Sequence, residues 1–363
     1  MNRLRRTLPQ EHTVVLGAGY AGVMAANQLA RTGFRTTVVT PVTHFVERVR
    51  LHRVASGHRP HARLPLAAVL HADVRTVIDT AVRIHPGDHR VALRSGRDIG
   101  YDRLVVAIGS ASNPRPGSNV HRIASEGSAA RLRDTLRKRP DWPITVVGAG
   151  LTGIELACVL AADGRAVTLV SRHALPDDHY HLALQERLTE LEICLQQGEI
   201  DNIADRSSVV VDTTGFTVPS LAADSGLPVD DHGRLTVQPD LLVPDHDHIV
   251  GAGDAVHVTG EQARHLRMSC ATALPMGVHA AGVIRNLHRG HQPEPFRHRY
   301  AIQSIDLGAT QGRVQFVTAT DAPRPFALTA RLGGIGKELV VRSTIGSLRR
   351  RARLYAHHGD GRR

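Results

Sequence analysis

Two short glycine-rich segments carry the residues whose spacing most clearly predicts chemistry. Residues 14–22 read VVLGAGYAG and residues 146–153 read VVGAGLTG, and a helical pattern follows each copy. In a G-x-G-x-x-G turn, the first glycine permits the tight turn, the second lets the backbone approach a pyrophosphate, and the third allows close helix–strand packing. The helix N-terminus then presents free N–H groups to the phosphates. The two copies therefore predict two dinucleotide sites, at Gly17, Gly19 and Gly22 and at Gly148, Gly150 and Gly153.

The two copies continue in parallel beyond the glycines. A second β-branched run ends at Thr40 in the first copy and at Ser171 in the second, each 23 residues after the first glycine of its motif. Residues 101–110 (YDRLVVAIGS) and 209–216 (VVVDTTGF) then predict buried strands that end in small-residue turns. In GAGDAV, residues 251–256, Asp254 is placed to accept a hydrogen bond from a ribityl or ribose hydroxyl. The alternative role for Asp254 is to cap a following helix.

The order of these motifs resembles that of a known family. GAGYAG, VVAIGS, GAGLTGIE, TTGF and GAGDAV follow one another across residues 14–256 as in the two-dinucleotide-domain flavoproteins of the pyridine nucleotide-disulfide oxidoreductase superfamily. The segments HFVERVRLHRVASG and IDLGATQGRVQF make the chain most similar to bacterial type II NADH dehydrogenase-like proteins. The resemblance implies an FAD-dependent oxidoreductase with NADPH or NADH as co-substrate. The implied fold is α/β, with two Rossmann-like domains of the three-layer ββα type, the nicotinamide domain inserted in the FAD domain.

The resemblance also implies which residues hold the two nucleotides. FAD is expected at Gly17, Ala18, Gly19, Tyr20, Ala21, Gly22, Thr40, Arg48, Ile108, Gly109, Gly253 and Asp254. The nicotinamide nucleotide is expected at Gly148, Gly150, Leu151, Thr152, Gly153, Ser171, Arg172 and Gly215. The catalytic candidates are Glu155, which matches an acidic residue that the family places near nicotinamide and flavin, and His52. The alternatives are a glutamate on the helix surface and a structural histidine.

Four departures from the family pattern bear on the chemistry. Thr40 stands where an acid usually grips the FAD ribose, and a single hydroxyl lacks the charged two-oxygen grip. No C-x₄-C follows the first motif, which argues against dithiol chemistry. The stretch from Leu191 to Val211 is short for the family's β-meander, and Leu274-Pro275 replaces a glutamine often found near the quinone. The last departure weakens the case for a quinone, and the expected acceptor is a quinone or another small molecule.

The end of the second copy's second strand predicts the coenzyme. An NAD-specific site usually has an acid there, which would repel a 2′-phosphate. Here Ser171 is followed by Arg172, and a guanidinium can grip a phosphate with two parallel N–H groups. We therefore expect NADPH to serve at least as well as NADH; the alternative is that Arg172 points into solvent.

The pattern divides the chain into three parts. We expect an FAD domain at residues 1–112 and 237–320, a nicotinamide domain at 118–236 after a proline-glycine linker at 113–117, and a C-terminal segment at 321–363. The run from Gly333 to Gly336 predicts a flexible stretch. The cluster Arg349-Arg350-Arg351 with Arg353 predicts a solvated tail, with a peripheral contact to an anionic membrane as the alternative.

Composition excludes several classes of protein. Cys158, Cys194 and Cys270 form no zinc or dithiol motif, and the densest histidine cluster, Asp245 to His248, is expected in a solvated loop. No uninterrupted apolar run is long enough to span a membrane, and no secretory signal is visible, so we expect a cytoplasmic protein.

The partners are less closely defined. The net charge of +11 brings no nucleic-acid motif with it, so we expect a small-molecule electron acceptor. One alternative acceptor is an acidic protein such as ferredoxin. Two alternative functions are a biosynthetic tailoring flavoenzyme and a catalytically degenerate nucleotide-binding protein. The oligomeric state is open, and a dimer is one possibility.

Overall fold

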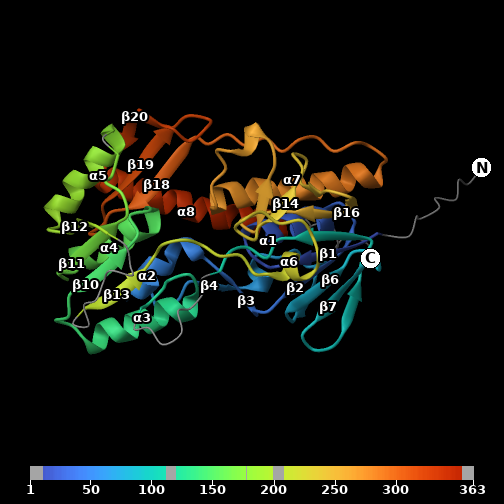
Figure 1. The fold of residues 1–363 in the computed structure, drawn as a ribbon, viewed down its shortest axis with the longest axis horizontal. Coiled ribbons are helices and arrows are strands. Elements are labelled where there is room, and N and C mark those ends of the chain that lie inside the picture. The colour runs from blue at the N-terminus through green and yellow to red at the C-terminus, as the bar shows by residue number, and fades with distance from the viewer. Residues whose placement is uncertain (1–10, 112–119, 177, 199–207, 354–363) are drawn as a thin grey trace, which may run out of the picture.

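The computed structural model describes residues 11–111, 120–176, 178–198 and 208–353. The chain forms two α/β units and a C-terminal unit of sheet and helix, as Figure 1 shows. The predicted fold class is confirmed, because each α/β unit is built on a parallel sheet. The predicted linker at 113–117 lies outside the described residues.

The first unit is built on a six-stranded sheet in the order β15-β16-β9-β1-β2-β5, in which only β15 runs antiparallel. Its interior strands are almost continuously apolar because both faces of the sheet are buried. The strands are β1 His12–Leu16, β2 Arg35–Thr40, β5 Arg75–Ile78, β9 Arg103–Val106, β15 Leu242–Val243 and β16 His246–Gly251.

Two helices and a second sheet complete the layers of this unit. Helices α1 (Tyr20–Arg31) and α7 (Cys270–His288) lie side by side, and a Cβ on Gly277 would overlap the carbonyl oxygen of Ala21. An antiparallel sheet adds Ile84, Val91 and Leu93 to the same core. Its strands are β6 Ala81–His85, β7 Arg90–Leu93 and β8 Asp98–Gly100.

The second unit is a four-stranded parallel sheet in the order β12-β11-β10-β13, with its own core. The strands are β10 Ile144–Val147, β11 Val167–Ser171, β12 Cys194–Gln197 and β13 Val209–Asp212, and the helices are α3 Glu126–Lys138, α4 Leu151–Ala162 and α5 His179–Glu190. The unit is inserted between β9 and β16 of the first sheet, as predicted.

The predicted return to the first unit at residue 237 comes too late. Helix α6 (Leu221–Asp224) packs against β6, and Leu221, Leu227 and Leu235 belong to the first unit's core. Short-range sequence patterns do not show which of the two cores receives these leucines.

The third unit is an antiparallel sheet of β18 (Ile302–Asp306), β19 (Gly312–Val317) and β20 (Pro323–Leu328), packed against the long helix α8 (Ala330–Arg353). The division expected at residue 320 falls inside this sheet, between β19 and β20. The arginine cluster forms the last turn of α8 rather than a tail, and Leu348 of the same turn is fully buried.

Short elements connect these units. Helix α2 (Leu51–Ala55) follows a 3₁₀ turn at Arg48–Arg50, and the other 3₁₀ turns are Leu66–Ala68 and Glu261–Ala263. Two small sheets pair β3 (His44–Val46) with β4 (Arg63–Pro65), and β14 (Leu235–Val237) with β17 (Val256–Val258). The histidine cluster predicted in a loop begins β16 instead, where the ring of His248 stacks on that of His89 with centroids 4.0 Å apart.

The glycine run of α8 is a packing surface, and the prediction of a flexible stretch was wrong. A Cβ on Gly333 would overlap the carbonyl oxygen of Gly312, and one on Gly334 would overlap that of Thr310. The missing side chains therefore allow α8 to lie directly on β19 and on the turn that precedes it.

This packing predicts opposite effects for two alanine substitutions in α8. Gly333→Ala would force the helix off β19 and should destabilise the protein by about 1–3 kcal/mol, the usual cost of overpacking. Gly346→Ala, where a Cβ meets no atom within 4 Å, should stabilise it by about 0.5–1 kcal/mol through helix propensity. Thermal unfolding monitored by circular dichroism measures both, and equal shifts of the two midpoints would contradict the packing argument.

Candidate functional site

The first glycine turn has the geometry that its sequence predicts. Gly17 has a φ of 104°, and a Cβ there would overlap the carbonyl oxygen of Ala107, which directly follows the neighbouring strand β9. A Cβ on Gly22 would overlap the carbonyl oxygen of Gly17, so this glycine holds α1 against its strand. Gly19 is the N-cap of α1, has open space around it and supplies no capping side chain. The first N–H groups of α1 are therefore free to bind an anion.

The second glycine turn repeats this geometry. Gly148 has a φ of 106°, and a Cβ on Gly153 would overlap the Gly148 carbonyl oxygen. Gly150 caps α4 in open space, again without a capping side chain. The hydroxyl of Thr213, just after β13, donates to the carbonyl of Val147 at 2.8 Å and closes the turn from the far side.

Both turns open onto one cavity of about 500 Å³. Predicted residues that line it come from both units: Gly19, Tyr20, Ala21, Arg48, His52, Gly109, Gly150, Leu151, Thr152, Glu155, Gly215, Gly253 and Asp254. Several lining residues were not predicted: Arg122, Asp212, Arg267, Cys270 and Lys337. Lys337 left a signal in the sequence, because it is one of only two lysines among 45 basic residues.

The other predicted residues do not line this cavity. Gly17, Gly22, Gly148 and Gly153 shape the turns behind it, and Ala18 and Ile108 lie beside them in the chain. Thr40 ends β2 as expected, but it is buried and its hydroxyl accepts the N–H of Val42 at 3.4 Å.

The strand end predicted to read the coenzyme also lies outside the cavity lining. Ser171 ends β11, and its hydroxyl donates to the carbonyl of His173 at 2.6 Å, while Arg172 is exposed. The hydroxyl hydrogen of Ser171 is therefore already used in this hydrogen bond.

Asp254 faces the cavity from the turn between β16 and β17. It accepts the hydroxyl of Ser110 at 3.1 Å, and Arg48 donates to the Ser110 carbonyl at 2.8 Å. Burial raises the pKa of Asp254, although Arg48 and Ser110 oppose the shift. The alternative of a helix cap is wrong, because strand β17 follows this aspartate.

A cluster of charged side chains forms one wall of the cavity. The Lys337 ammonium lies 2.8 Å from the Glu155 carboxylate, which also accepts the backbone N–H of Asp306 at 3.1 Å. The imidazole of His52 lies between two carboxylates, with Nε2 at 3.0 Å from Asp306 and Nδ1 at 3.6 Å from Glu155. Glu155 is therefore buried within this cluster and is not on the helix surface.

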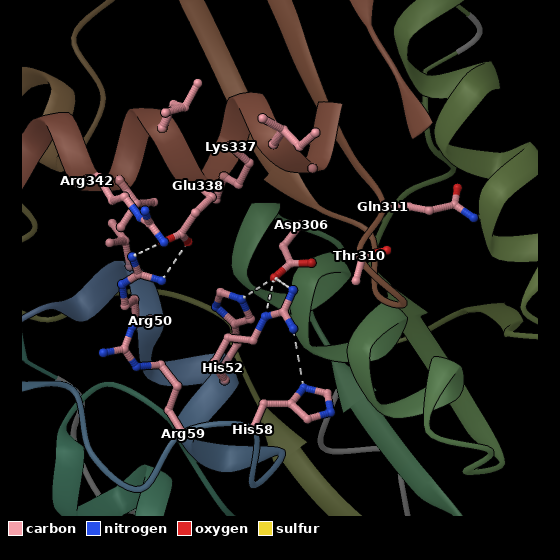
Figure 2. A pocket seen from close by; sticks show the side chains of 16 residues that line it. Arg50, His52, His58, Arg59, Asp306, Thr310, Gln311, Lys337, Glu338 and Arg342 are labelled. Carbon is pink, nitrogen blue, oxygen red and sulfur yellow. Dashed lines mark hydrogen bonds and ion pairs between the residues drawn. The ribbon is translucent and has the colours of Figure 1, made fainter. Parts of the chain in front are cut away.

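The cluster keeps the Asp306 carboxylate charged. Burial would raise the pKa of Asp306, but the hydrogen bond from His52 and the charges of His52 and Arg53, whose guanidinium lies at 2.6 Å, hold that pKa far below its usual range. Figure 2 shows His52 and His58 on the same side of Asp306.

The cysteines take no part in this charge cluster. Burial raises the pKa of Cys158 to about 12 and also raises that of Cys270, so both thiols are neutral. Within the described ranges, no group of three or more His, Cys, Asp or Glu side chains is arranged to hold a metal ion.

Comparison with known proteins agrees with this geometry. The model of the pyridine nucleotide-disulphide oxidoreductase family matches residues 11–277. The chain belongs to this family. It is 29% identical over 364 residues to an NADH dehydrogenase-like protein of Mycobacterium tuberculosis, covering 85% of this chain and 90% of that protein. It is 25% identical over 317 residues to the type II NADH:quinone oxidoreductase of the same species, covering 69% of this chain and 68% of that one.

The fold is shared with solved structures as well. The sulfide:quinone oxidoreductase of Aquifex aeolicus superposes with a TM-score of 0.79 over 94% of this chain and 92% of its own, at 18% identity. Together the family and its relatives make this chain an FAD-dependent NAD(P)H oxidoreductase of the type II NADH dehydrogenase-like kind.

The residues present fit FAD in the first unit. A Cβ at Gly19 would project into the open space in front of the uncapped N-terminus of α1, where a pyrophosphate needs room. The hydroxyl of Tyr20 is buried, lines the same cavity and has no partner in the described part of the chain. When bound, FAD supplies the electron chemistry, and this chain binds, orients and screens it.

The two open glycines predict two separable losses. Gly19→Val should abolish FAD binding, because the side chain would occupy the approach to the pyrophosphate while meeting no protein atom. Gly150→Val should retain FAD but lose its reduction by NAD(P)H, for the same reason in the second unit. The absorbance of the purified protein gives the FAD content, and anaerobic mixing gives the reduction. A Gly19→Val protein with normal FAD content would refute the assignment.

Proposed function

We propose that this protein transfers hydride from NAD(P)H to FAD and passes the electrons on to a quinone or another small-molecule acceptor. One observation carries the proposal: the two anion-binding helix N-termini, at Gly19 and Gly150, open onto the same cavity. Two nucleotides held there from opposite sides would bring their reactive rings together, and positioning is the main contribution that a protein makes to such a reaction.

The charged wall of the cavity gives Glu155 and Lys337 their proposed roles. The ammonium of Lys337 also donates to the Ser304 carbonyl at 3.0 Å, so its position is fixed by two acceptors. It presents a proton donor and a positive charge to the cavity, and Glu155 orients it. His52 lines the cavity between two carboxylates and is proposed to share protons with Glu155, while a purely structural role in joining α2 to β18 is the alternative.

Two observations support a quinone as the electron acceptor: the similarity to a type II NADH:quinone oxidoreductase and the surface of helix α8. A quinone reaches a peripheral enzyme from a membrane, and α8 carries the exposed apolar residues Leu332, Ile335 and Leu339, each more than half exposed. Arg342 lies on the same helix and is exposed beside them. We propose that this face contacts an anionic membrane surface, since apolar side chains beside arginines suit such a surface. No helix in the described ranges has the length and hydropathy to cross a bilayer.

An acidic protein is the second candidate acceptor, and the net charge of +11 favours it. The two acceptors differ in their response to salt, because attraction between oppositely charged surfaces is screened. Turnover with a water-soluble quinone should change little with added salt. If quinone turnover is absent and turnover with an acidic ferredoxin falls steeply with salt, the quinone proposal fails.

Glu155 gives the most direct test of the wall's role. Glu155→Gln removes the charge that holds Lys337 and should slow reduction of the bound flavin by NAD(P)H roughly tenfold or more, at unchanged FAD content. The control is Glu190→Gln, an exposed glutamate of α5 that lies outside the cavity lining. Unchanged rapid-reaction kinetics in Glu155→Gln would make this residue purely structural.

The coenzyme proposal has its own test at Arg172. We propose that this exposed arginine grips the 2′-phosphate of NADPH, so Arg172→Ala should cost NADPH about 1.5–3 kcal/mol in kcat/KM, the range for hydrogen bonds to charged groups, and leave NADH nearly unaffected. Equal losses for both coenzymes, or a wild type that strongly prefers NADH, would show that Arg172 does not read the phosphate.

A further inference from the structure

A second cavity of about 560 Å³ lies beside the nucleotide cavity (Figure 2). Its walls come from α2 and the residues around it, from the turn between β18 and β19, and from the first turns of α8. Val49, His52, Lys337 and Val341 line both cavities, so the two are separated by one layer of side chains. Neither glycine turn reaches the second cavity.

Four of the five arginine and lysine side chains that line the second cavity make ion pairs. Arg50 and Arg342 both bond to Glu338, Arg50 through two N–H groups at 2.9 Å. These bonds hold the pKa of Glu338 at about 2 although burial opposes them, so it stays charged. Arg53 pairs with Asp306 and Lys337 with Glu155.

Arg59 is the cation that remains. Its backbone N–H bonds to the carbonyl of Arg53 at 3.0 Å, which fixes the residue just after α2. Within the described ranges, no carboxylate lies within ion-pair distance of its guanidinium, although the side chain is half-buried. In Figure 2 the Arg59 side chain extends toward Arg50, and no dashed line reaches it. A partly desolvated guanidinium without a counter-ion is costly and favours an anion beside it.

The opposite rim of the cavity is apolar. Ile335 and Leu339 lie one helical turn apart on α8 and are exposed by 59% and 60%, and Val49 and Val341 continue this surface inward.

The turn between β18 and β19 forms another wall of the cavity, and its residues Gly308, Ala309 and Thr310 all have positive φ. The Gly308 N–H bonds to Asp306, and Arg187 donates to the Leu307 carbonyl.

We propose that the second cavity binds a small organic anion that carries a carboxylate and a short hydrocarbon chain. The carboxylate would bond to Arg59, whose two-pronged donor geometry matches it. The hydrocarbon chain would lie along Val49 and the cavity-facing sides of Ile335 and Leu339, and so remove apolar surface from water. A neutral ligand would leave Arg59 uncompensated, and a cation would be repelled by it.

The test is isothermal titration of the FAD-loaded protein with octanoate, with octan-1-ol and octyltrimethylammonium as probes of equal chain length and different charge. Octanoate should bind in a one-to-one ratio, and each of the other two at least about tenfold more weakly, because only the carboxylate bonds to a charged partner. Saturating NADP⁺ should leave the octanoate affinity unchanged, since the glycine turns line the other cavity.

Two variants locate the site. Arg59→Gln should weaken octanoate binding at least about tenfold, whereas Arg264→Gln, which removes an arginine of equal charge from an exposed site outside both cavities, should leave it unchanged. Failure of octanoate to bind at millimolar concentration, equal binding of octan-1-ol, or wild-type affinity in Arg59→Gln would each overturn the proposal. None of these measurements uses electron transfer, so their outcome is independent of the proposed acceptor.

Discussion

The buried carboxylate of Glu155 joins the second unit to the third and to the connecting helix α2. It stands on α4 of the second unit, pairs with Lys337 on α8 of the third, and approaches His52 on α2, which packs into the core of the second unit. It also accepts the backbone N–H of Asp306, so β18 ends at a fixed place beside it. Because His52, Asp306 and Lys337 each lie more than 100 residues from Glu155 in the chain, their meeting depends on how α2, the second unit and the third unit are placed relative to one another.

Because the charges at this junction are buried, removal of one charged partner is expected to cost more free energy of unfolding than the intact pair contributes. A buried ion pair offers little net stability over a well-packed apolar cluster, but loss of one partner leaves a buried charge without compensation and costs about 3–5 kcal/mol. Here each charge has more than one partner: Asp306 is held by His52 and Arg53, and Lys337 by Glu155 and a carbonyl. The network therefore holds the N–H donors of His52 and Lys337 at the wall of the nucleotide cavity. An apolar cluster in the same place would supply no such donors.

The local features of this site could be predicted from the sequence, because they depend on neighbouring residues. A positive φ at Gly17 and Gly148, open space at Gly19 and Gly150, and strands that end at Thr40 and Ser171 all follow from short patterns. Asp306 was missed because its role depends on contacts with His52 and Arg53, which lie 254 and 253 residues away in the chain. Arg59 was missed because its role depends on having no ion-pair partner among the described residues of the folded protein, which the sequence does not show. The glycine run of α8 was misread for the same reason: glycine allows flexibility or close packing, and only the facing carbonyls of Gly312 and Thr310 decide which.

The central claim is that two nucleotides meet in one cavity, and single-turnover reduction tests it most directly. FAD-loaded protein is mixed anaerobically with one equivalent of NADPH or NADH, and the visible absorbance band of the flavin is followed in time. The account predicts that this band is lost with at least one of the two coenzymes, in a ratio of one coenzyme to one FAD. An FAD-loaded protein whose flavin band persists with excess of both coenzymes would contradict it.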